Sequence, residues 1–188
     1  MTTITVLSAK GGASKTTLAL TLAASAPASP LVIDTDPSES AARWAAALGL
    51  DSATARSATA LRGALRASKA EIAVVDTPPL YEDESVVQAA IDAADAVLVP
   101  LNPSPADIDR LALITPLLQG KTWSIVVTQE RAYTRLGAAL RDQLAEAELP
   151  VLTTGIPSRE ATRVAWGSEA PDPLAGKLLW AELIGEEA

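Results

Sequence analysis

The chain has 188 residues, 48% of them apolar, and a formal net charge of −8. This composition suits one globular domain with a sizeable core and argues against a strongly nucleic-acid-binding surface. Cysteine and histidine are both absent, which excludes disulfides, thiolate metal sites, thiol catalysis and the usual histidine base, and leaves carboxylates, lysines, hydroxyls and backbone amides, with a hard cation such as Mg²⁺.

Short runs rich in valine and isoleucine alternate along the chain with stretches rich in alanine and leucine. The runs predict strands at Ile4–Ser8, Leu31–Asp34, Glu71–Asp76, Ala96–Leu101, Trp123–Thr128 and Val151–Thr153. The stretches predict helices near residues 15–26, 38–48, 59–68, 84–93, 105–119, 134–147, 159–166 and 173–185. Apolar strands separated by helices indicate a parallel sheet with helices on both faces. We therefore expect an α/β fold, a single domain over residues 1–188, with its ligand at the carboxyl ends of the strands.

Neither end of the sequence has the pattern of a membrane segment. The N-terminus leads directly into the first strand without the basic and apolar regions of a signal peptide, and no apolar run reaches the ~18 residues of a spanning helix. The last helical stretch has a leucine and tryptophan face but sets Lys177 against Glu182, Glu186 and Glu187, so anionic lipid would repel it. We expect a cytoplasmic protein with no membrane partner, whose last helix packs on the core.

Residues 8–17, S-A-K-G-G-A-S-K-T-T, follow the first predicted strand and open the first predicted helix. Glycines let the backbone approach a phosphate, and the N–H groups of such a loop form an anion-binding nest. In this pattern Lys15 holds the β- and γ-phosphates and the Thr16 hydroxyl binds Mg²⁺. The predicted nucleotide-binding residues are Gly11, Gly12, Ala13, Ser14, Lys15, Thr16 and Thr17.

Ser14 stands where phosphate-binding loops nearly always have glycine. A serine there costs on the order of 1–2 kcal/mol if the backbone has a positive φ. That strain would weaken nucleotide affinity about tenfold per 1.4 kcal/mol. We therefore expect a working but slow site.

Carboxylates end two of the predicted strands. In Asp34-Thr35-Asp36-Pro37 one carboxylate can reach the water shell of a metal and the other can orient an attacking water. Asp76 ends an apolar strand in the manner of a Walker B element, near Mg²⁺ and Thr16. The alternatives are a helix cap with a turn proline for the first motif and a proline-stiffened turn for the second.

Four motifs together resemble the ParA/MinD family of deviant Walker-type ATPases, and the resemblance covers the whole chain. They are K-G-G-x-x-K-T-T at 10–17, D-T-D-P-x-x-S-A-x-x-W at 34–44, V-V-D-T-P-P at 74–79 and V-P-L-N-P-S-P-A-D at 99–107. The likeness is greatest to the short ParA type, which lacks an N-terminal helix-turn-helix extension. It implies a P-loop NTPase fold, ATP and Mg²⁺ as cofactors, and a homodimer that sandwiches two ATP molecules.

The resemblance also implies roles for single residues. Lys10 would reach across the dimer interface to the partner's phosphates, and Asp36 would orient the hydrolytic water, so that Lys10, Lys15 and Asp36 are the predicted catalytic residues. Thr16, Asp34 and Asp76 are the predicted metal-site residues.

Two further positions depart from the family pattern. Ser38 replaces the usual glutamine, and Thr128-Gln129 replaces the asparagine that helps read adenine. Pro157 is a candidate for packing against the base, with a simple turn proline as the alternative.

The resemblance leaves three functions open. The first is partition of plasmid or chromosomal DNA over the nucleoid, with hydrolysis stimulated by a ParB-like protein. The second is positioning of a protein cargo such as a bacterial microcompartment through a cargo adaptor. The third is a catalytically weak, nucleotide-dependent structural adaptor. Binding to non-specific DNA would use Arg159 and Arg163, which share one helix face; further basic candidates are Arg131, Arg135, Arg141 and Lys177.

Overall fold

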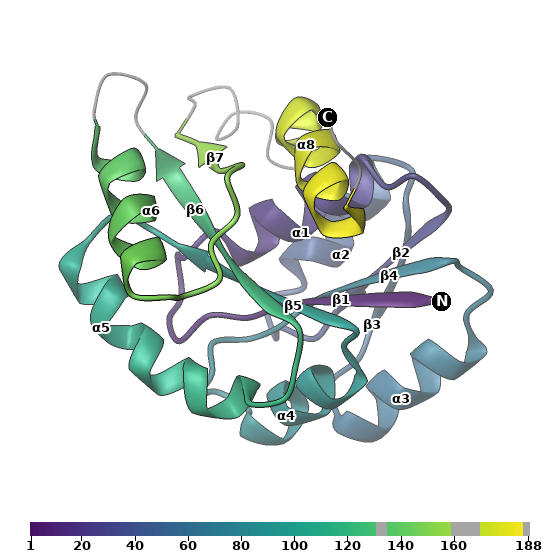
Figure 1. Ribbon diagram of the computed structural model, residues 1–188. Helices are drawn as coiled ribbons and strands as arrows, with labels where there is room; N and C mark the ends of the chain where they lie inside the picture. Colours follow the sequence, from purple (N-terminus) through teal and green to yellow (C-terminus); the bar gives the residue numbers. More distant parts are fainter. Residues whose placement is uncertain (131–134, 159–169, 186–188) are drawn as a thin grey trace.

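The structure is a computed structural model that describes residues 1–130, 135–158 and 170–185 (Figure 1). The strands are β1 (Thr2–Val6), β2 (Pro30–Asp34), β3 (Asp51–Thr54), β4 (Ile72–Asp76), β5 (Ala96–Leu101), β6 (Trp123–Glu130) and β7 (Ile156–Pro157). They form one sheet in the order β3-β2-β4-β1-β5-β6-β7, and every pair is parallel. The helices are α1 (Lys15–Ala24), α2 (Ser40–Ala47), α3 (Ala58–Ala67), α4 (Glu84–Ala93), α5 (Pro105–Ile114), α6 (Leu136–Glu146) and α8 (Pro173–Ile184), and a 3₁₀ turn, η1 (Thr115–Leu118), follows α5.

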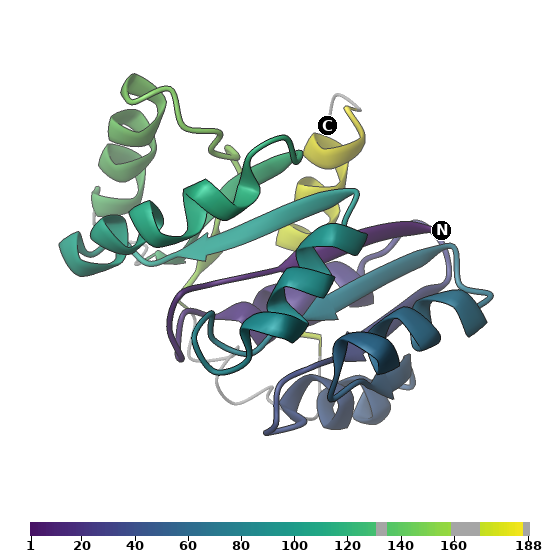
Figure 2. The ribbon, with the colours of Figure 1, turned by 90° about the horizontal axis from the view of Figure 1, so that it is seen from below.

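Helices cover both faces of the sheet, which confirms the predicted fold class. One face carries α1, α2 and α8, and the other carries α3, α4, α5 and α6 (Figures 1 and 2). The first layer buries Leu22, Trp44 and Leu179 in one apolar cluster with the sheet. The second layer buries side chains of α4, α5 and α6 against β5 and β6. Because both faces are covered, all five residues of β4 are buried, as the unbroken apolar run predicts.

The edge strand β3 was not predicted. Three of its four residues, Asp-Ser-Ala-Thr, are polar and exposed, and the strand pairs with β2 from Leu31↔Asp51 to Asp34↔Thr54. Short, polar edge strands protect a sheet from pairing with other chains, and they carry no apolar pattern that a sequence can reveal.

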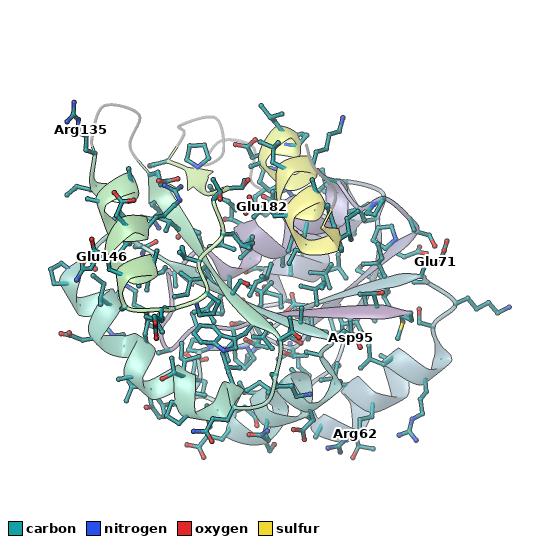
Figure 3. All side chains as sticks on the ribbon, viewed as in Figure 1. Arg62, Glu71, Asp95, Arg135, Glu146 and Glu182 are labelled. Carbon is teal, nitrogen blue, oxygen red and sulfur yellow. The ribbon has the colours of Figure 1, made fainter. Side chains whose placement is uncertain are left out.

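The predicted strand at Val151–Thr153 is wrong in extent. Only Val151 pairs there, in an isolated bridge with Ile125, and the ladder resumes at β7. The N–H groups of Thr153 and Thr154 instead donate to the Glu182 carboxylate at 2.8 and 2.7 Å. Figure 3 shows Glu182 on α8 facing this segment. A side chain from a distant helix thus replaces the neighbouring strand as the acceptor.

The helical predictions agree with the structure to within two residues for most elements, and α4 coincides with its predicted range. The helix predicted over 105–119 is interrupted, because Pro116 lacks an N–H and the last turn tightens into η1. The helix predicted at 159–166 lies outside the described residues.

The last helix, α8, packs closely on α1. Trp180 donates its indole N–H to the carbonyl of Leu22 at 2.9 Å, and α8 begins where Asp172 caps the N–H of Ala175 at 3.1 Å. Among the described residues, no helix is long and apolar enough to cross a membrane.

Gly176 on α8 makes this approach possible, and its substitution tests the contact. A Cβ there would lie 2.5 Å from the carbonyl oxygen of Thr21 and 2.7 Å from the Cβ of Ser25. We expect Gly176→Ala to lower the free energy of unfolding by about 1–3 kcal/mol, as for other overpacked contacts. The matched control is Gly63→Ala on α3, where a Cβ meets nothing within 4 Å and better helix propensity should stabilise by about 0.5–1 kcal/mol. Urea unfolding measures the free energy of unfolding of both variants. Equal effects of the two substitutions would contradict the close contact of Gly176 with α1.

Candidate functional site

The candidate site lies at the carboxyl ends of three adjacent strands. Strand register places Val6 beside Asp76 and Asp76 beside Asp34. Two threonines hold these ends together: Thr35 donates its hydroxyl to the carbonyl of Asp76 at 2.9 Å, and Thr77 donates to the carbonyl of Val6 at 2.8 Å. The threonine after each strand-end aspartate therefore fixes the position of the carboxylate before it.

The loop between β1 and α1 forms a cradle for an anion. Gly12 has φ 72°, and a Cβ at Gly11 or Gly12 would meet nothing within 4 Å, so open space lies next to both. No side chain caps the first turn of α1, which leaves its N–H groups available to a ligand. Lys15 is buried, and its ammonium donates to the carbonyl of Lys10 at 3.3 Å. Burial lowers the pKa of Lys15, while the carboxylates of Asp76, Asp36 and Glu82 raise it.

This cradle opens into a cavity of about 640 Å³, a volume typical of small-molecule sites. The cavity brings together most of the predicted nucleotide-binding residues and the predicted water-orienting Asp36, and it adds Glu82 and Pro79 from the loop after β4. Its lining residues are Gly11, Gly12, Ser14, Lys15, Thr16, Thr17, Asp36, Pro37, Ser38, Pro79 and Glu82.

Thr16 and Asp76 make the contact expected of a Mg²⁺ site. The Thr16 hydroxyl donates to Oδ2 of Asp76 at 2.7 Å, and Oδ1 of Asp76 is buried with no hydrogen-bond partner among the described residues. Burial raises the pKa of Asp76 to about 7, against the Thr16 hydrogen bond, which lowers it. An orphaned carboxylate oxygen beside a hydroxyl is a donor set that suits Mg²⁺ and its water shell. The residues present therefore fit the cation.

Asp34 and Asp36 use their carboxylate oxygens differently. Asp34 is fully buried and uses both oxygens on backbone N–H groups, those of Asp36 at 3.0 Å and Ala42 at 2.9 Å. It thereby fixes the turn that carries Asp36 and the start of α2. Asp36 lines the cavity and accepts from the N–H of Ser38 at 2.8 Å. Because both oxygens of Asp34 already accept from backbone N–H groups, whereas one oxygen of Asp76 has no described partner, Asp76 and Thr16 are the better metal candidates.

Lys10 does not point freely into solvent. Its ammonium lies 2.6 Å from Oδ1 of Asp107 on α5, and Arg110 donates to the same oxygen at 2.9 Å. Asp107 is 4% exposed. Burial would raise its pKa, but the hydrogen bonds and charges of Lys10, with those of Ser104 and Arg110, hold the pKa of Asp107 below its usual value. Lys10, the additional lysine of the loop, is therefore held by a carboxylate of its own chain.

Ser14 has φ 69°, so the condition for backbone strain at this position is met. Gln129, at the end of β6, lies over the loop. Its amide donates to Oγ of Ser14 at 3.2 Å and to the carbonyl of Gly12 at 3.4 Å, and Gln129 itself has φ 56°. The residue found where the family usually reads adenine thus contacts the phosphate loop instead.

Other predicted residues lie away from this cavity or outside the description. Pro157 pairs with Glu130 at the sheet edge and is absent from the described residues that line the cavity. Arg141 forms an ion pair with Glu130, so its charge is already compensated. Arg159, Arg163 and Arg131 lie outside the described residues.

Sequence reasoning gave no role to two residues that contact the site, Glu82 and Asp107. Asp107 stands within a motif that carries the family resemblance, and this motif was the available signal. Glu82 lies in a loop without a motif of its own. Gln129 was named only as part of the Thr128-Gln129 pair at the adenine position, and its contact with the phosphate loop was not predicted.

Known proteins resemble this chain in sequence and in fold. Residues 4–170 match the CobQ/CobB/MinD/ParA nucleotide binding domain (CbiA). The chain belongs to this ParA/MinD family. Within the family, it is 33% identical over 164 residues to maintenance of carboxysome distribution protein A from Gloeobacter kilaueensis, covering 84% of this chain and 74% of that protein.

Two solved structures of ParA/MinD type share the fold at lower identity. A complex of Cyanothece McdA with ATP superposes with a TM-score of 0.75 at 18% identity, covering 100% of this chain and 98% of that one. A plasmid partition protein from Borrelia burgdorferi bound to AMPPNP gives 0.74 at 18% identity, covering 98% and 99%. At these identities the likeness concerns the fold.

The raised pKa of Asp76 predicts a pH dependence of stability. Between its ordinary pKa of 3.8 and about 7, the folded chain keeps a proton that the unfolded chain has lost. The contribution of Asp76 to stability therefore falls as the pH rises through this window. We expect the difference in free energy of unfolding between the wild type and Asp76→Asn to fall from pH 5 to pH 7, by up to about 1.4 kcal/mol per pH unit.

Asp107→Asn is the control, because the pKa of Asp107 is lowered and its contribution to stability is lost only as the pH falls toward and below the ordinary value of 3.8. The difference in free energy of unfolding between the wild type and Asp107→Asn should stay constant over pH 5–7. Denaturant unfolding at each pH measures all three proteins. A flat difference for Asp76→Asn would contradict the raised pKa.

The left-handed backbone of Ser14 predicts that glycine improves the site. Ser14→Gly should tighten binding of a slowly hydrolysed ATP analogue by about fivefold to thirtyfold, since about 1–2 kcal/mol of strain is relieved. Ser14→Ala is the matched control, because it removes the hydroxyl and keeps the strained backbone. Isothermal titration calorimetry compares the three proteins. If the glycine and alanine variants bind equally, backbone strain does not limit affinity.

Proposed function

We propose that this chain is a ParA-type ATPase that positions a protein cargo inside the cell through ATP-dependent dimerisation. The observation that carries the choice of cargo is the 33% identity, over 84% of the chain, to a protein named for carboxysome distribution. This likeness supports positioning of a protein cargo over partition of DNA. The plasmid partition neighbour, at 18% identity, supports the fold alone.

The site supports ATP as the ligand. The triphosphate would lie in the loop cradle, with the Lys15 ammonium and the first turn of α1 against its negative charge. Thr16 and Asp76 would hold Mg²⁺ and its water shell, and the cation would supply charge neutralisation of the β- and γ-phosphates. Asp36, which lines the same cavity, would orient the attacking water. These residues argue against the catalytically weak adaptor, because the groups proposed to bind phosphate, metal and the attacking water gather at one site.

Lys10 supports the dimer. A phosphate-binding loop needs one lysine, and Lys15 already lies in its cavity. A second lysine that contacts the partner's γ-phosphate would give the ATP state a dimer affinity that the ADP state lacks. Cargo would be coupled through an activator protein that speeds hydrolysis. Non-specific DNA of the nucleoid is the proposed track, with Arg159 and Arg163 as the candidate contacts.

The proposal predicts distinct effects for three substitutions. Lys15→Ala should weaken ATP binding by about tenfold to a hundredfold, as expected for a lost charged hydrogen bond. Asp36→Ala should keep ATP binding, lower turnover by about a hundredfold or more, and trap the dimer. Lys10→Ala should bind ATP but remain monomeric.

Three measurements check these outcomes: calorimetry for ATP binding with Mg²⁺, phosphate release for turnover, and light scattering for mass. Arg62→Ala on the distant helix α3 is the control variant (Figure 3). An absence of nucleotide binding at millimolar ATP would refute the proposal. Unchanged turnover in Asp36→Ala would remove Asp36 from its assigned role.

A further inference from the structure

A second hollow, outside the nucleotide cavity, lies between α4 and the end of α5. It has a volume of about 560 Å³. We call it the α4–α5 groove. Its lining residues are Leu80, Tyr81, Glu84, Ser85, Val87, Gln88, Leu113 and Leu117. Figure 2 looks onto the face of the molecule that carries these helices. We propose that the groove binds the apolar side of a basic amphipathic helix from a partner protein, namely the activator of the proposed function, on which this inference rests.

The groove gathers apolar surface that the fold leaves uncovered. Tyr81 is 60% exposed, Leu113 44% and Leu117 37%, and these are three of the eight exposed large apolar side chains among the described residues. The groove floor, Leu80 and Val87, is buried core. Exposed apolar area costs roughly 25 cal/mol per Å², so a concentrated patch is a binding surface more often than scattered leucines are.

The shape of the groove suits a helix. Glu84 and Gln88 are one turn apart on α4. Leu113, near the end of α5, and Leu117, in η1, line the groove from the other helical segment. Apolar side chains spaced i, i+3 or i+4 and i+7 on a partner helix would lie between these two walls. The volume is within the range of roughly 300–1,000 Å³ that small ligands occupy, so it admits a few side chains rather than a domain.

The charge of the rim specifies a basic partner. Among the described lining residues only Glu84 is charged, and Asp83 comes directly before it in the chain. The N–H of Val86, with the Ser85 hydroxyl, lowers the pKa of Asp83, so this carboxylate is ionised at neutral pH. Lysines or arginines flanking an apolar stripe would complement this rim, and nucleic acid would be repelled by it.

The groove shares structure with the nucleotide site in two places. The first is the loop after β4: Pro79 and Glu82 line the nucleotide cavity, whereas Leu80 and Tyr81 line the groove. The N–H of Leu80 also donates to the carbonyl of Ser8, next to the phosphate loop, at 3.1 Å. A helix in the groove would therefore press on a segment that forms one wall of the nucleotide cavity.

The second shared element is α5. Arg110 stands one turn before Leu113 on the same helix face, and it donates to Asp107, which holds Lys10. Contact with Leu113 would thus act one turn from Arg110, which itself contacts the carboxylate that holds the dimerisation lysine. Both connections give a partner in the groove a physical route to change turnover.

The test uses a designed probe, because the natural partner is unidentified. A fluorescein-labelled 18-residue helical peptide carries leucines at i, i+3, i+4 and i+7 with lysines elsewhere, and a scrambled peptide of the same composition is its control. Fluorescence anisotropy is measured without nucleotide. We expect Leu117→Asp and Leu113→Asp to weaken binding by tenfold or more and Glu84→Lys to weaken it at least threefold. Leu136→Asp, at a 60% exposed leucine on α6, should leave binding unchanged.

The proposal would be overturned if the scrambled peptide bound equally well, or if Leu117→Asp left peptide binding unchanged. It would also be overturned if the wild type self-associated and Leu117→Asp abolished this, because the groove would then bind a second copy of the chain. Circular dichroism and ATP titration confirm that each variant is folded and binds nucleotide. Phosphate release then tests the coupling, and the peptide should change turnover in the wild type and not in Leu117→Asp. If the wild type does not bind ATP, the proposed function is contradicted. Peptide binding is measured without nucleotide, so it tests the groove separately.

Discussion

The candidate site depends on one constraint, the in-register alignment of the carboxyl ends of β1, β4 and β2. Val6, Asp76 and Asp34 lie side by side because the strands are parallel and paired without slippage. A shift of one residue would turn the Asp76 carboxylate to the opposite face of the sheet and away from Thr16. The threonines that donate to neighbouring carbonyls at these ends keep the register where the chemistry needs it.

Much of the fold could be predicted from the sequence because the central strands are buried on both faces. The unbroken apolar run of β4 is an example, and the loop of glycines and lysines after β1 marks the ligand end of the sheet. Prediction failed at the edges of the sheet, because contacts with neighbouring segments, and not the sequence pattern, decide the structure there. The polar strand β3 forms because β2 offers it a partner, and the segment after Val151 leaves the ladder because Glu182 offers its N–H groups an acceptor.

At the site, the sequence identified residue types but not how each oxygen is used. Asp34 and Asp76 both read as strand-end carboxylates, yet Asp34 holds two backbone N–H groups while Asp76 keeps a buried oxygen free of described partners. The same holds for Gln129, whose contact with the phosphate loop joins residues far apart in the chain. Such differences arise from tertiary packing, which residue spacing does not encode.

The contact between Lys10 and Asp107 has a consequence for how salt would act on the proposed dimer. On dimerisation, Lys10 would leave the Asp107 carboxylate of its own chain and contact a phosphate bound to the partner. Ions screen both arrangements, so assembly should depend less on ionic strength than a dimer built from newly formed ion pairs. Arg110 would remain on Asp107 after the exchange. The departing lysine would therefore not leave an isolated charge in the protein interior, which would otherwise oppose dimerisation by several kcal/mol.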